Sequence, residues 1–86
     1  MTFDKWIDAV NASVRASLGD TVRTEELGWD SALWVGPAGT AAATLGDDEK
    51  TARFVFDRGE AASYVLGDSA ATPEVVGAAV VAHISR

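Results

Sequence analysis

The sequence predicts an α+β fold: a two-layer sandwich of an N-terminal helix, a five-stranded antiparallel meander and a C-terminal helix. Helical periodicity marks both ends of the chain, and short strand-forming runs fill the middle. Gly, Pro and Asp separate these runs too closely to leave room for crossover helices. With 86 residues, of which 48% are hydrophobic and 23% charged, the chain can build one core. Residues 1–86 are therefore expected to form a single domain.

The first predicted element is an amphipathic helix from Phe3 to Leu18. Thr2 precedes it as a candidate N-cap, and Asp4 suits the positive end of the helix dipole. Gly19 is placed to end the helix, because glycine readily adopts the left-handed conformation after a last turn. The apolar side chains recur at steps of three and four residues, and they are Phe3, Ile7, Val10, Val14 and Leu18, with Trp6 beside them.

Five strands are predicted between residues 20 and 66. Gly-, Pro- and Asp-rich turns connect them, and Gly59 fits a type I turn followed by a bulge. The predicted strands are Asp20 to Leu27, Ala32 to Gly36, Thr40 to Leu45, Thr51 to Asp57 and Ala61 to Leu66.

The C-terminal helix has the clearest local signals. Thr72, Pro73 and Glu74 supply an N-cap, a first-turn proline and an acidic side chain at the positive end of the dipole. Gly77 weakens this helix by about 1 kcal/mol relative to alanine, so we expect it to permit a close approach to the sheet. The apolar face is formed by Val76, Val80 and Ile84, with Val75 and Ala79.

Alternation along the strands predicts which face of the sheet the helices cover. In the fourth strand Phe54 and Phe56 point to one face and Val55 to the other, so the phenylalanines should meet the helices. By the same alternation Tyr64 faces the helices and Val65 the open side.

The second strand leaves the open face ambiguous. Leu33 and Val35 alternate with Trp34, so either Trp34 or the other two lie on the open face together with Val55 and Val65. Large exposed apolar patches on small proteins usually mark contact sites. We therefore consider this face as a partner-binding surface or as the seam of a homodimer, which small domains often form to gain stability.

The two edges of the predicted sheet differ in charge. The first strand carries Arg23, Glu25 and Glu26, which discourage edge-to-edge pairing, whereas the fifth strand carries no charge. The fifth strand is the natural place for strand addition by a partner or by a second copy.

A Leu-Gly-Asp pattern recurs at the ends of the first helix and of three strands, where it fits turns in which Asp bonds to turn amides. Successive turns of a meander alternate between its ends, so three of these turns should gather carboxylates around Trp29. We consider three interpretations: an acidic end that is only solvated, a binding site for a basic partner with Trp29 as its anchor, and a Ca²⁺ site. The Ca²⁺ site is the least favoured, because Asp47, Asp48 and Glu49 are consecutive and their side chains cannot easily converge on one ion. The carboxylates are Glu26, Asp30, Asp47, Asp48, Glu49 and Asp68.

Composition narrows the function classes. The chain has no cysteine, one histidine (His83) and no nucleophile elbow or phosphate loop, so we expect no enzyme, no metal site and no cofactor. A net charge of −6 disfavours nucleic acid and anionic membranes and favours a basic protein partner. The absence of cysteine and of an N-terminal apolar run suggests the cytoplasm. Arg-, Ala- and Gly-rich usage suggests a bacterial or phage origin.

These observations lead to two functional hypotheses. The first is a small acidic cytosolic protein-binding module, for example an inhibitor or an immunity-type protein. Bacterial immunity proteins and phage proteins that disable host factors are similar in size and charge, although no motif is shared. The second is a self-assembling structural or ligand-sensing domain that forms a homodimer through the open sheet face.

Overall fold

A computed structural model describes residues 2–57 and 59–85, and for Glu26 the backbone only. The chain forms two helices around an antiparallel sheet of order β1-β2-β3-β4-β5, which confirms the predicted α+β fold. The elements are α1 (Phe3–Leu18), the 3-10 turn η1 (Gly19–Thr21), β1 (Arg23–Leu27), β2 (Ser31–Val35), β3 (Thr40–Leu45), β4 (Thr51–Phe56), β5 (Ala61–Val65), the 3-10 turn η2 (Ser69–Ala71) and α2 (Pro73–Ile84).

The main differences from the predicted boundaries are the two 3-10 turns. β1 begins at Arg23 rather than at Asp20, because the Thr21 hydroxyl donates to the Leu18 carbonyl and holds η1. Gly19 has the positive φ expected of a residue that ends a helix, at 56°. Before α2, the Asp68 side chain accepts a hydrogen bond from the Ala70 amide and so caps η2.

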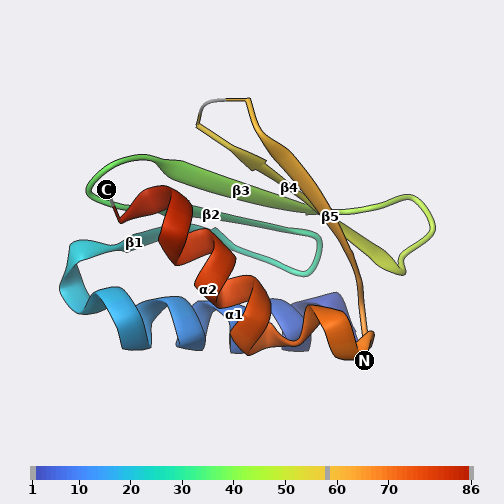
Figure 1. The fold of residues 1–86 in the computed structure, drawn as a ribbon. Helices are drawn as coiled ribbons and strands as arrows, with labels where there is room; N and C mark the ends of the chain where they lie inside the picture. The colour runs from blue at the N-terminus through green and yellow to red at the C-terminus, as the bar shows by residue number, and fades with distance from the viewer. Residues whose placement is uncertain (1, 58, 86) are drawn as a thin grey trace.

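Both helices lie on one face of the sheet, below it in the view of Figure 1. The indole N–H of Trp6 in α1 donates to the carbonyl of Ala71, just before α2, so the two helices begin at the same end of the molecule. Neither described helix is long and apolar enough to cross a bilayer.

Gly77 lies where α2 crosses α1. A Cβ at Gly77 would be 2.5 Å from the Ser13 hydroxyl and 2.7 Å from the Ser13 Cβ. The expectation that Gly77 permits a close approach to the sheet is therefore wrong. It permits the close approach of α2 to α1, and this contact holds the helices together over the sheet.

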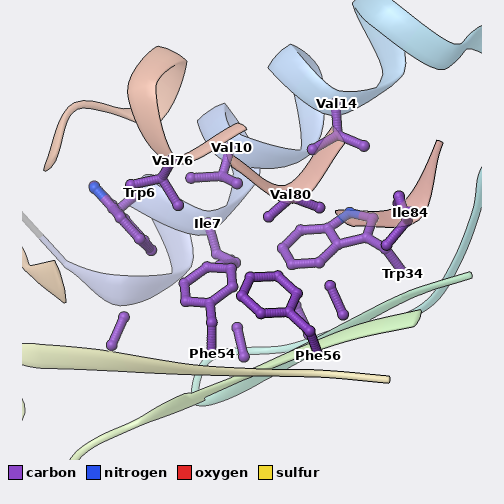
Figure 2. Packing of buried hydrophobic residues seen from close by; sticks show 14 of the residues in the cluster. Trp6, Ile7, Val10, Val14, Trp34, Phe54, Phe56, Val76, Val80 and Ile84 are labelled. Carbon is purple, nitrogen blue, oxygen red and sulfur yellow. The ribbon is translucent and has the colours of Figure 1, made fainter. Parts of the chain in front are cut away.

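The core fills the space between the sheet and the two helices, as Figure 2 shows. On this face β3 contributes the small Ala41 and Ala43, which are the cross-strand neighbours of Trp34 and Phe54, and at its end the partly buried Leu45. The large rings from β2 and β4 therefore meet above β3. Trp34 and Phe54 stack with their ring centroids 6.1 Å apart and an interplanar angle of 5°.

Trp34 belongs to this core, so its prediction as a partner-binding residue on the open face is wrong. Its side chain is 0% exposed, and Leu33 and Val35 take the open face instead. Burying an indole requires an acceptor for its N–H. The acceptor is the Asn11 side-chain oxygen, which is 2.8 Å from Trp34 Nε1 and also accepts from the Thr24 hydroxyl at 2.8 Å.

Candidate functional site

The end of the sheet at which the helices begin carries a row of loops, which we call the acidic end: residues 28–30, 46–50 and 66–68. Backbone hydrogen bonds join these loops to their neighbours. The Leu45 amide donates to the Asp30 carbonyl, and the Leu66 amide donates to the Lys50 carbonyl, both at 2.8 Å. The predicted gathering of these turns at one end therefore agrees with the structure.

Trp29 is the most exposed of the large apolar side chains in the described part of the chain, at 68%. Two adjoining hollows, of about 400 Å³ and about 240 Å³, share Trp29, Leu45 and Glu49 in their walls. Asp4 completes the acidic lining of the larger hollow. We call the following set the Trp29 site: Trp29, Leu45, Asp4, Asp30, Asp47 and Glu49.

Asp4 is the member of this site that the sequence assigned only to a helix dipole. It reaches the site because η1 is the only connection between α1 and β1, so α1 must start where β1 ends. That short connection is the signal from which the position of Asp4 could have been inferred. The neighbouring Thr2 side chain lowers the pKa of Asp4.

Asp48 was predicted as a partner-binding residue, but its oxygens are engaged inside its own turn. One oxygen accepts from the backbone amides of Lys50 and Thr51, at 3.0 and 3.1 Å, and the other accepts from the Thr51 hydroxyl at 3.0 Å. The Lys50 amide and then the Thr51 hydroxyl hold the pKa of Asp48 below its ordinary value of 3.8. Asp48 therefore fits the other interpretation of the Leu-Gly-Asp pattern, in which the Asp side chain bonds to the amides of its own turn.

Asp68 does not join the described Trp29 site. Asp68 follows β5, whereas Trp29 follows β1 at the other edge of the sheet, and Asp68 lines a separate hollow of about 150 Å³ with Trp6 and Pro73. Its carboxylate caps η2. The side chain of Glu26 lies outside the described residues.

The helix termini give the acidic end a structural reason for its charge. A helix N-terminus carries a partial positive charge, which nearby carboxylates stabilise. Asp4 stands in the first turn of α1 and Glu74 in the first turn of α2. Part of the acidity at this end therefore supports the two helices. Asp30, Asp47 and Glu49 belong to strand turns, so the dipoles do not explain them.

The Trp29 site combines an exposed aromatic face with four carboxylates. A guanidinium or ammonium group can stack on an indole face and also donate charge-assisted hydrogen bonds to carboxylates. The described residues that line the two hollows include no lysine or arginine. Among the described side chains, no three carboxylate or histidine groups converge closely enough to hold a metal ion. An indole face beside several carboxylates is chemistry that suits an organic cation.

The open face of the sheet is a second candidate surface. Leu33, Ala42, Val55 and Ala61 are cross-strand neighbours on four successive strands, so they form one apolar row. Val55 is 43% exposed, and Val65 on β5 is 52% exposed. The predicted placement of both valines on the open face is confirmed.

His83 lies at the other end of the molecule from the Trp29 site. Its ring stacks on Phe56 with centroids 3.7 Å apart, and its Nδ1 is 3.7 Å from a carboxylate oxygen of Glu60. These contacts give His83 a packing role at the end of α2.

Comparisons with models of known protein families, with curated proteins and with solved structures find no match to this chain.

Proposed function

We propose that this protein is a small acidic protein-binding module whose Trp29 site receives a basic side chain of a partner protein. The observation that carries the proposal is the exposure of Trp29 in a hollow walled by carboxylates. An indole left 68% exposed is a large apolar surface for an 86-residue domain to leave in water. Tryptophan is also among the residues most enriched in binding hot spots.

The charges of the Trp29 site give the proposed partner its chemistry. A lysine or arginine over the indole face gains roughly 0.5–2 kcal/mol from the cation–π interaction, more as water is excluded. Asp30, Asp47 and Glu49 surround that face and supply the counter-charge. A net charge of −6 steers a basic protein toward the domain from a distance.

More specifically, we propose that the protein acts as an inhibitor or as an immunity-type protein, which blocks its partner by binding to it. In that role the acidic domain covers a basic functional surface of its partner, in the cytoplasm of a bacterium or of a phage-infected cell. Trp29 would then serve as the anchor, and the carboxylates would select a basic surface over neutral ones.

Affinity capture from the native lysate tests the proposal. Wild-type protein should retain a basic partner at low salt and release it at about 1 M salt, where the screening length falls to about 3 Å. Trp29→Ala should lose that partner. Val75→Ala removes another exposed apolar side chain, 51% exposed, from α2, and this variant should retain the partner. Capture that resists salt and survives Trp29→Ala would contradict the proposal.

A second candidate function uses the open face. The apolar row Leu33, Ala42, Val55 and Ala61 crosses four strands without a covering element in the described structure. A self-assembling structural domain or a ligand-sensing domain would use such a surface. Salt-resistant capture that is lost on Val55→Lys would favour this function over the Trp29 site.

A further inference from the structure

The two edge strands of the sheet are protected to very different degrees. β1 carries an ion pair, Arg23 Nη2 to Glu25 Oε1 at 3.0 Å, and its pairing with β2 is interrupted between Thr24 and Glu26. Charges and irregular pairing are the features by which edge strands avoid adding another strand. β5 has neither: its sequence is Ala-Ala-Ser-Tyr-Val, and it pairs with β4 in unbroken register.

The hydrogen bonds of the β4–β5 pair fix which groups of β5 point outward. The Phe56 amide donates to the Glu60 carbonyl and the Leu66 amide to the Lys50 carbonyl, both at 2.8 Å. Even-numbered residues of β5 therefore direct their backbone groups toward β4. Because this direction alternates along an antiparallel strand, Ala61 and Ser63 direct both their N–H and C=O groups to the outer edge. Val65 directs its N–H there, while its carbonyl already accepts from the Asp68 amide at 3.1 Å.

We infer that β5 is the seam of a symmetric homodimer, in which β5 of a second copy of this chain pairs antiparallel about a two-fold axis at Ser63. In this register Ser63 faces Ser63 of the second copy, and Ala61 faces Val65. The N–H and C=O of Ser63 then pair with those of the second Ser63, and the Ala61 carbonyl of each copy meets the Val65 N–H of the other. A two-fold centred on Ala62 or on Tyr64 would leave Val65 or Ala61 opposite a turn glycine.

The side chains of β5 fit the same register. On the open face Val65 faces the small Ala61 of the second copy, and on the helix face Tyr64 faces Ala62. Both pairs place a large side chain beside a small one, which suits closely spaced cross-strand neighbours. Ala62 and Tyr64 are only partly buried against the core, so each has surface left for a neighbouring strand to cover.

The antiparallel arrangement also keeps the acidic loops of the two chains apart, although each chain has a net charge of −6. The two-fold places the acidic end of one copy beside the opposite end of the other, which separates the two carboxylate clusters. Both Trp29 sites stay uncovered, because Trp29 follows β1 at the far edge from β5. The dimer therefore does not depend on the proposed function of the Trp29 site.

Light scattering and sedimentation equilibrium of the whole chain test this seam. Wild-type protein should be a concentration-dependent dimer. Ser63→Lys places two like charges opposite each other across the two-fold and should raise the dimer dissociation constant at least about tenfold. Thr44→Lys adds the same charge to the same open face on the interior strand β3, and it should leave the dimer intact.

Amide hydrogen exchange supplies the second measurement. In the wild-type dimer the amides of Ala61, Ser63 and Val65 should exchange slowly, and in Ser63→Lys they should exchange fast. The amides of Ala62 and Tyr64 face β4 and should stay protected in both proteins, which shows that the variant is folded. A wild-type monomer at all concentrations would overturn the inference, as would dissociation by Thr44→Lys or an intact Ser63→Lys dimer.

Discussion

At the scale of single residues, hydrogen bonding decides which polar and aromatic side chains remain available. The alternation in β2 leaves open whether Trp34 or Leu33 and Val35 point inward, because all three are apolar. The structure resolves this through Asn11, which is distant in sequence and supplies the acceptor that a buried indole needs. For Asp48, hydrogen bonds within its own turn occupy the carboxylate that the sequence predicted for partner binding.

Asn11→Leu should destabilise the protein by about 1–3 kcal/mol, because it leaves the buried N–H of Trp34 without its acceptor. Urea denaturation measures the loss. Asn11→Asp is the matched control, since it keeps an oxygen of the same shape and should retain most of the stability. Equal stability of the Leu variant and the wild type would show that the Asn11 contact contributes nothing.

At the scale of elements, local signals predict the helices best. Thr72 accepts a hydrogen bond from the Val75 amide, as its position before Pro73 suggested, and α1 has the predicted bounds Phe3–Leu18. The 3-10 turns η1 and η2 escaped prediction because single side chains, those of Thr21 and Asp68, hold them. The contact at Gly77 escaped because a helix crossing is a tertiary feature with no periodic signal.

Gly77→Ala should lower the stability of the protein, although alanine favours an isolated helix by about 1 kcal/mol over glycine. The added Cβ would lie 2.7 Å from the Ser13 Cβ, and rotation of the Ser13 side chain cannot relieve this contact, so α2 must move away from α1. Overpacking of this kind costs about 1–3 kcal/mol. Thermal unfolding measures the change, and a higher melting temperature for Gly77→Ala would refute the close helix crossing described above.

At the scale of the whole molecule, the meander topology determines which carboxylates meet. Alternation of the turns between the two ends correctly brings Trp29, Asp30, Asp47 and Glu49 together. The same rule failed for Asp68, because it fixes the end of the sheet but not the distance across five strands. The net charge of −6 does not by itself indicate a binding site, because acidity also serves solubility. The clustering of the carboxylates around Trp29 is what indicates a function.

The most direct test of the Trp29 site is an NMR titration of the ¹⁵N-labelled protein with a hexa-arginine peptide at low salt. We expect the largest shifts at the Trp29 indole and at the amides of Asp30, Asp47 and Glu49. Trp29→Ala should weaken peptide binding at least about fivefold, the equivalent of roughly 1 kcal/mol of cation–π interaction. Shifts spread equally over remote carboxylates such as Asp57, which follows β4 at the opposite end of the sheet, or unchanged affinity of Trp29→Ala, would contradict a cation-binding role for this site.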